Sequence, residues 1–284
     1  MNDRLDSFNA INDDVRVRDL EVNGEQGPLR ARLYATGQKG KRDTLVVFFP
    51  PGGFVTDNLD DSDSFLRHLA GVSHTPVVLA SNYTLATVRP FPAAVEDAHA
   101  VLLWAKKNKT KLGWNGKHLL VAGIEAGANL AAVCALMSRD RGAPKLAGQI
   151  LIMPMLDPGL STCSMREMPN CPDQEKLADG CAAAYRGYLP NAADRTHPYA
   201  SPLQSSRLKN LPPALILSAE DDPLRDEAEA YGAKLASFGV QATVRRLLPT
   251  PQADERNECA CERPALAEIA TFIADLEGQG ALPP

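Results

Sequence analysis

Apolar positions change their spacing several times along the chain, and each spacing predicts a different element. Residues 15–22 and 29–34 alternate apolar and polar side chains on either side of a turn at 23–27, a pattern typical of an antiparallel hairpin. Residues 44–49 are apolar throughout, which indicates a central strand covered on both faces. The chain therefore begins with a hairpin and continues into the middle of a sheet.

From residue 44 onward, apolar runs of strand length alternate with helical periods. Further strands are expected at 76–80, 119–122, 148–153, 211–218 and 242–248, and helices at 64–70, 93–105, 126–137, 226–238 and 265–276. Gly239 follows one of these helices at the position where a left-handed residue ends a helix. The alternation predicts an α/β fold, a mostly parallel sheet with helices on both faces.

Residues 157–200 depart from this alternation. They are rich in proline and cysteine, carry scattered charges, and contain one helical stretch at 174–188. Such an insertion is the usual place for a cover over a binding site, so we expect a lid here. No repeat and no second domain is evident, and we take residues 1–284 as a single α/β domain with this insertion.

Composition narrows the possible functions. The net charge of −5 comes without long runs of either sign, which argues against nucleic acid or an anionic membrane as partner. The sequence starts without a signal-peptide core and has no run able to span a bilayer, so we expect a cytoplasmic protein with reduced thiols. The histidines show no metal spacing and none lies near Cys259 and Cys261, so no metal or other cofactor is expected.

The stretch 119–130 carries the strongest sign of chemistry. An apolar run ends at Gly123, a second glycine follows at Gly127, and an alanine-rich helix comes next. A residue between two such glycines lies on a sharp strand-to-helix turn where the two backbones approach closely. That residue is Glu125, at the place where a Gly-x-Ser-x-Gly elbow carries its nucleophile.

Other polar groups are expected at the same edge of the sheet. Gly52 and Gly53 follow the first buried strand, and Asp222 follows a later one. Ligands of such sheets bind at the carboxyl ends of the strands, and a glycine pair leaves backbone N–H groups free to face them. We therefore expect these three residues and Glu125 to line one pocket for a small molecule.

Taken in order, these motifs resemble those of the α/β-hydrolases in the hormone-sensitive-lipase-like esterase family. The family's His-Gly-Gly-Gly-Phe, Pro-Phe-Pro-Ala-Ala-x-Glu-Asp-Ala, Gly-Asp-Ser-Ala-Gly-Gly-Asn-Leu and Asp-Pro-Leu-Arg-Asp-Glu segments correspond to residues 50–54, 90–98, 123–130 and 222–227. The resemblance implies the α/β-hydrolase fold and a homodimer. It also implies a triad acid at Asp222 and an oxyanion hole formed by the backbone N–H groups of Gly52, Gly53 and Ala126.

Two triad positions depart from the family pattern. Glu125 stands in place of the nucleophilic serine, and Gln252 lies near the place of the histidine, with no histidine anywhere after His197. Triad chemistry needs a nucleophile, a base and an acid, so two of the three are missing.

Several interpretations of these residues remain open. Glu125 is a nucleophile or general base, or it binds a cationic or hydrogen-bond-donating ligand, or its carboxylate folds into the oxyanion hole and blocks an ester carbonyl. Asp222 either shares a pocket with Glu125, so that one of the two stays protonated, or only accepts loop N–H bonds. Gln252 either binds one of these carboxylates or points to solvent.

Our first hypothesis is a degenerate, non-hydrolytic member of the family that binds a small molecule or a partner protein in the former active-site pocket. The second is an enzyme in which Glu125 and Asp222 move protons beside the oxyanion hole, as in a lyase, isomerase or cyclase. The third is weak carboxylesterase activity without the triad, because an oxyanion hole and substrate binding retain some rate enhancement. The sequence does not identify the ligand.

Overall fold

The computed structural model describes residues 14–37, 40–72, 76–166, 174–248 and 262–279. Within them, eight strands form one sheet in the order β1-β2-β4-β3-β5-β6-β7-β8. β1 pairs antiparallel with β2 and β2 with β4, whereas all later pairs are parallel. The strands are β1 (Val15–Asn23), β2 (Pro28–Thr36), β3 (Arg42–Phe49), β4 (Val77–Ser81), β5 (Trp114–Ile124), β6 (Gly148–Ile152), β7 (Ala214–Ala219) and β8 (Ala242–Leu247).

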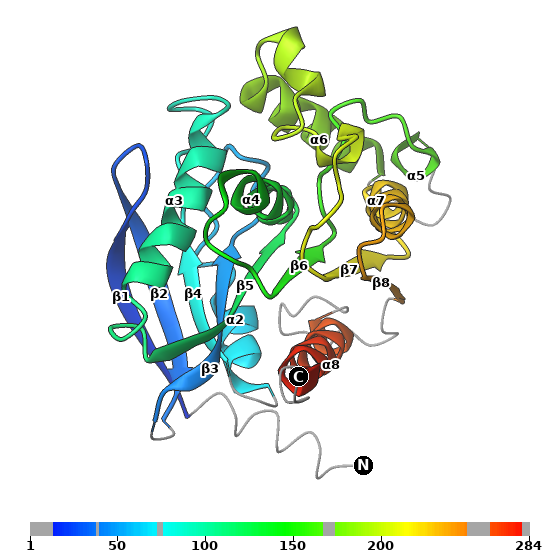
Figure 1. Cartoon of the computed structure of the whole chain (residues 1–284). Coiled ribbons are helices and arrows are strands. Elements are labelled where there is room, and N and C mark those ends of the chain that lie inside the picture. The colour runs from blue at the N-terminus through cyan, green and yellow to red at the C-terminus, as the bar shows by residue number, and fades with distance from the viewer. Residues whose placement is uncertain (1–13, 38–39, 73–75, 167–173, 249–261, 280–284) are drawn as a thin grey trace.

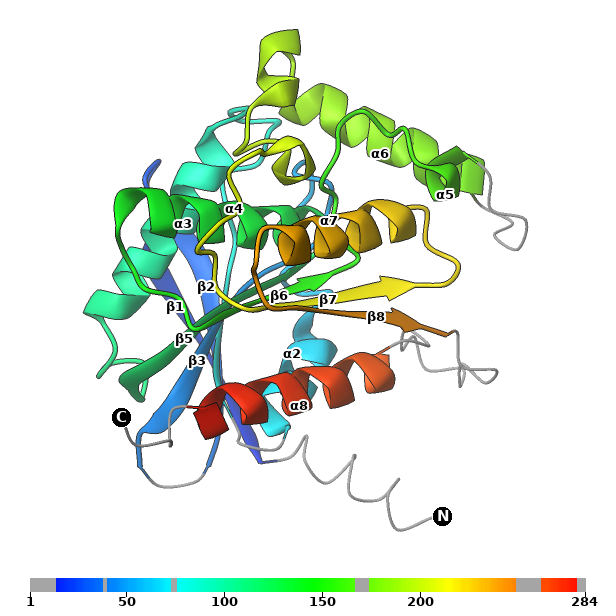
Figure 2. The ribbon, with the colours of Figure 1, turned by 45° about the vertical axis from the view of Figure 1, so that its right-hand side comes forward.

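Helices cover both faces of this sheet. α3, α4 and α7 lie on one face, α2 and α8 lie on the other, and α6 lies beyond the end of the sheet (Figure 1, Figure 2). The helices are α2 (Asp63–Gly71), α3 (Ala93–Lys107), α4 (Ala126–Arg141), α5 (Cys163–Arg166), α6 (Gln174–Tyr188), α7 (Arg225–Ser237) and α8 (Glu262–Gln279), with 3-10 turns η1 (Ala192–Thr196) and η2 (Pro202–Gln204).

The core consists of two layers, one on each side of the sheet. In β3, Leu45 and Val47 pack into the layer that includes α3 and α4, while Val46 and Phe48 pack into the layer that includes α2 and α8. All four side chains are fully buried. Successive strand residues point to opposite faces, so a strand covered on both sides must be apolar at every position. This confirms the interpretation of residues 44–49.

The predicted alternation of strands and helices is confirmed, including the opening hairpin and the helix at 174–188, which is α6. Gly239 follows α7 with a φ of +77°, as its predicted position requires. Several boundaries differ by up to four residues, and the largest error is at β5, which begins at Trp114 rather than at residue 119. Polar residues 115–118 hide this end of the strand, whereas the Trp114 indole is buried and donates to the Asp43 carbonyl at 2.9 Å. None of the described helices is long and apolar enough to cross a membrane.

Candidate active site

Glu125 lies on a strained turn between β5 and α4. Its φ of +49° and ψ of −113° are unusual for a residue with a side chain. A Cβ atom on Gly123 would lie 2.2 Å from the Gly127 carbonyl, and one on Gly127 would lie 2.0 Å from the Phe49 carbonyl oxygen. Strand and helix therefore meet too closely for a side chain at either position, and the predicted strand–turn–helix arrangement is confirmed.

Backbone hydrogen bonds fix this turn to the loop that follows β6. The Glu125 N–H donates to the Ile152 carbonyl at 3.0 Å, and the Glu125 carbonyl accepts the N–H groups of Asn129 and Met155 at 3.0 and 3.2 Å. The Asn129 amide also donates to the Met155 carbonyl at 2.8 Å. The elbow and the loop after β6 thus form one hydrogen-bonded unit, which offsets the strain at Glu125.

The loop after β3 brings backbone N–H groups to the same place. Gly52 and Gly53 both have positive φ, at +124° and +58°, which favours glycine at these positions. The Gly52 N–H donates to Oε2 of Glu125 at 3.3 Å. Among the three proposed oxyanion donors of the described chain, Gly52 is the one with an assigned bond to this carboxylate. Ala126 opens α4, where the first N–H groups have no acceptor within the helix.

The structure brings Glu125 and Asp222 into one electrostatic environment. Both side chains are half-buried. Burial raises the pKa of Glu125, with the Gly52 N–H acting in the opposite direction. Burial also raises the pKa of Asp222 to about 6; the Leu224 N–H, 2.8 Å from Oδ1, opposes this, and the negative charge of Glu125 adds to it. No basic side chain of the described residues contributes to either shift.

Helix α6 faces this edge of the sheet (Figure 2). A Cβ atom on Gly53 would lie 2.9 Å from Cβ of Ala184, so the glycine is also needed for close packing against α6. Phe54 stacks on Tyr188 with ring centroids 3.7 Å apart. The pKa of the Cys181 thiol is raised to about 12, first by burial and then by carboxylates that include Glu125.

Sequence reasoning missed one buried acid beside this site. Glu227 is 1% exposed and belongs to the first turn of α7, where acids usually favour the helix dipole from the surface. Its spacing from Leu224, Ala228 and Tyr231 places it on the buried stripe of the helix, and this spacing was the available signal. Gln252, the residue near the histidine position, lies outside the described residues.

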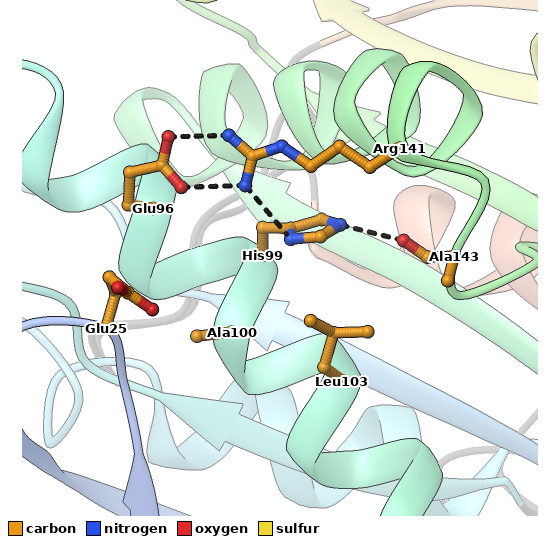
Figure 3. Close-up of a pocket in the computed structure, with 7 residues that line it drawn as sticks. All are labelled: Glu25, Glu96, His99, Ala100, Leu103, Arg141 and Ala143. Carbon is orange, nitrogen blue, oxygen red and sulfur yellow. Dashed lines mark hydrogen bonds and ion pairs between the residues drawn. The ribbon is translucent and has the colours of Figure 1, made fainter.

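A separate cavity of about 250 Å³ lies between the hairpin turn, α3 and the end of α4 (Figure 3). Across it, Glu96 accepts two hydrogen bonds from Arg141 at 2.6 and 2.7 Å. His99 Nε2 lies 2.8 Å from the Ala143 carbonyl, and burial lowers the pKa of this histidine. These side chains bind one another across the cavity. The cavity therefore marks a contact between α3 and the end of α4. Among the described residues, no group of His, Cys, Asp or Glu side chains is placed to hold a metal ion.

Comparison with known proteins identifies the family. A family model for the alpha/beta hydrolase fold matches residues 46–251. The chain belongs to the alpha/beta hydrolase fold family. Within it, the chain is 34% identical over 238 residues to esterase LipI of Mycobacterium tuberculosis, covering 82% of this chain and 73% of LipI. It is 35% identical over 205 residues to carboxylesterase NlhH of the same species, covering 70% of this chain and 63% of NlhH.

Solved structures of the family agree with this placement. An esterase of Pyrobaculum calidifontis has a TM-score of 0.83 at 36% identity, covering 99% of this chain and 91% of that one. A carboxylesterase cloned from a metagenomic library, EstE1, has a TM-score of 0.82 at 31% identity, covering 95% and 94%. The α/β-hydrolase fold is therefore established for this chain.

The comparisons contradict our first hypothesis, that of a degenerate, non-hydrolytic binding protein. Relatives at 31–35% identity carry the names esterase, carboxylesterase and arylesterase, and the structural neighbours are esterases. That hypothesis gave one side chain, Glu125, more weight than the glycine loop and the strained elbow that surround it. These backbone features are the costly ones to build, and the chain has both.

Proposed function

We propose that this chain is a carboxylesterase that hydrolyses small carboxylic esters at the edge of the sheet where Glu125 lies. The observation that carries the proposal is the strained elbow, with the Glu125 carboxylate 3.3 Å from a backbone N–H of the glycine loop. In this arrangement, a general base and oxyanion donors both face the carbonyl group of a bound ester. The names of the relatives support the same reaction class.

In this proposal Glu125 takes the position of the family's nucleophile and acts as a general base. Its carboxylate accepts a proton from a water molecule while the water oxygen attacks the ester carbonyl carbon, and the carbonyl oxygen becomes the oxyanion. The tetrahedral intermediate then breaks its bond to the alcohol oxygen, which leaves with the proton held by Glu125. The products are a carboxylic acid and an alcohol, and the Glu125 carboxylate is restored.

The oxyanion is held by the N–H groups of Gly53 and Ala126, because the Gly52 N–H is directed at Glu125. An oxyanion hole and substrate binding alone leave about 10³–10⁴-fold acceleration over water. A positioned general base adds about 10²–10⁴-fold. We therefore expect a slower esterase than one with a complete triad, and a rate that depends on the ionised form of Glu125.

We further propose that residues 157–200 act as the lid of this site. Their helix α6 packs Ala184 against the glycine loop and Tyr188 against Phe54, so the lid contacts the oxyanion loop directly. A lid in this position excludes water from the intermediate and limits substrates to small esters.

The test is turnover of 4-nitrophenyl acetate by wild type, Glu125→Gln and Glu125→Ala, with the buffer rate subtracted. We expect wild-type turnover above the buffer rate and a loss of about 10²-fold or more in both variants. Glu21→Gln, which alters an exposed carboxylate on β1, is the matched control and should keep the wild-type rate. Wild type at the buffer rate, or equal rates in all variants, would contradict the proposal.

A further inference from the structure

Glu227 is a buried carboxyl group that the proposed reaction does not use. Its Oε2 accepts the N–H of Asp157 at 2.9 Å, whereas its Oε1 has no hydrogen-bond partner among the described residues. Burying a polar atom without a partner costs about 1–3 kcal/mol. A side chain that is 1% exposed and carries such a cost in the first turn of α7 is unusual for a purely structural acid.

The bond from Glu227 connects α7 to the loop after β6, and that loop is itself bound to the elbow that carries Glu125. Asp157 lies in the loop after β6, and two residues earlier the Met155 N–H is bound to the Glu125 carbonyl at 3.2 Å. On the other side, α7 begins directly after the loop of Asp222, whose carbonyl accepts the Arg225 N–H at 3.0 Å. Glu227 therefore ties the elbow loop to the helix that follows Asp222.

The groups that face Glu227 come from three neighbouring segments. α6 contributes Tyr185 and Cys181, the loop after β6 contributes Asp157, and the loop before α7 contributes Asp222. The Tyr185 hydroxyl is buried and also lacks a partner among the described residues. No basic group belongs to this set, so an ionised Glu227 would have no opposite charge to bind.

We propose that Glu227 is a positioning residue of this active site, which holds the loops of Glu125 and Asp222 in register and directs its second oxygen toward α6. This inference rests on the proposed esterase function. It assigns Glu227 no contact with the substrate, and its effect passes through the Asp157 N–H and the loop after β6.

We expect the carboxyl group of Glu227 to be neutral in the active enzyme. Burial raises the pKa of Glu227 well above its usual range, N–H groups of residues 156 and 157 act against this, and the charges of Asp157 and Asp222 add to it. A neutral carboxyl still accepts the Asp157 N–H, and it places no charge beside the acids that face it. Ionisation as the pH rises would place an unpaired charge beside Asp222 and strain the loops.

The test compares Glu227→Gln and Glu227→Ala with wild type, using kcat, KM and the full pH profile for 4-nitrophenyl acetate. Glutamine reproduces the neutral carboxyl, so we expect kcat within about 3-fold of wild type at neutral pH. We expect wild-type kcat to decline as the pH rises and Glu227 ionises; glutamine cannot ionise, so this alkaline decline should disappear in Glu227→Gln. Alanine removes the acceptor of the Asp157 N–H, so the loop after β6 is no longer held to α7. The resulting misplacement of Glu125 should lower kcat about 10-fold or more with little change in KM. Glu229→Gln, on the same helix but paired with Arg246, is the control.

The outcomes separate this inference from the proposed function. If wild type is active but Glu227→Gln keeps the wild-type alkaline decline, or folded Glu227→Ala keeps the wild-type kcat, the inference is wrong and the esterase proposal stands. If Glu227→Ala fails to fold, the pH profile of Glu227→Gln decides alone. If wild type shows no turnover, the proposed function and this inference fall together.

Discussion

Carboxylates occur in two contrasting clusters in this molecule. Beside the hairpin, Arg32 binds Asp19, Asp60 and Asp63 at 2.7, 2.9 and 3.1 Å, and Arg30 binds Asp60 at 2.7 Å. The Arg30 guanidinium, followed by that of Arg32, holds the pKa of Asp60 below its usual value. At the carboxyl ends of the parallel strands, Glu125, Asp222 and Glu227 lie near one another, and none has a basic partner among the described residues.

In this second cluster, Glu125, Asp222 and Glu227, burial raises the pKa of every carboxyl. The pKa values of carboxyl groups are therefore shifted in opposite directions at these two places. They are lowered beside the arginines and raised at the ends of the parallel strands. Acids with arginine partners stabilise a surface modestly, whereas buried acids without a basic partner oppose folding. The contrast supports the proposed site at this edge of the sheet without use of any motif.

The pH dependence of hydrolysis should show this contrast most strongly. In the proposed reaction Glu125 acts as a base only when ionised, and burial raises its pKa above the ordinary value. We therefore expect kcat/KM to rise with pH, at a higher pH than an unperturbed glutamate would give. Cys181→Lys, which places a cation near both acids, should move the rise to lower pH. A profile without such a rise would contradict the assigned environment.

Stability should show the same contrast with a smaller effect. The folded-state pKa of Asp222, about 6, lies above the ordinary value of 3.8. Its stabilising contribution is therefore full below the unfolded pKa and is lost as the pH rises through about 6. Asparagine still accepts the Leu224 N–H, so Asp222→Asn should raise the free energy of unfolding at about pH 8 by about 1–2 kcal/mol, and by about half as much at about pH 5.

Urea denaturation at both pH values would measure this gain. Asp60→Asn is the matched substitution in the paired cluster, and there we expect no gain at either pH, because the arginines lose a partner. A gain in both variants would mean that removing any negative charge stabilises this acidic chain, and the contrast between the clusters would not hold.

Much of the fold could be predicted from the sequence because its signals are local. A continuously apolar run such as 44–49 marks a strand buried on both faces, and the spacing of Gly123 and Gly127 marks a strand and helix in close contact. The position of Glu125 on the turn followed from the same spacing. These features depend on neighbours a few residues apart, which a single sequence contains.

The environment of the site could not be predicted in the same way. The contact of Glu227 with the Asp157 N–H joins residues 70 positions apart, and the contact of the Gly52 N–H with Glu125 joins residues 73 apart. The functional hypothesis failed for a related reason. That hypothesis judged the site from one side chain, whereas the packing of Gly53 and Phe54 against α6 becomes visible only in three dimensions.

The smallest expected effect concerns the paired cluster itself. Arg32 is 12% exposed and binds three carboxylates, so Arg32→Gln removes several ion pairs together. Exposed pairs contribute about 0.2–1 kcal/mol each, and salt screens them, so we expect a loss of about 1 kcal/mol at low salt that shrinks in about 1 M NaCl. Thermal unfolding at the two salt concentrations measures this. The gain in Asp222→Asn should persist in salt, because burial rather than an exposed charge pair causes it. A salt-independent loss in Arg32→Gln would instead indicate that the arginine stem stabilises the hairpin by packing.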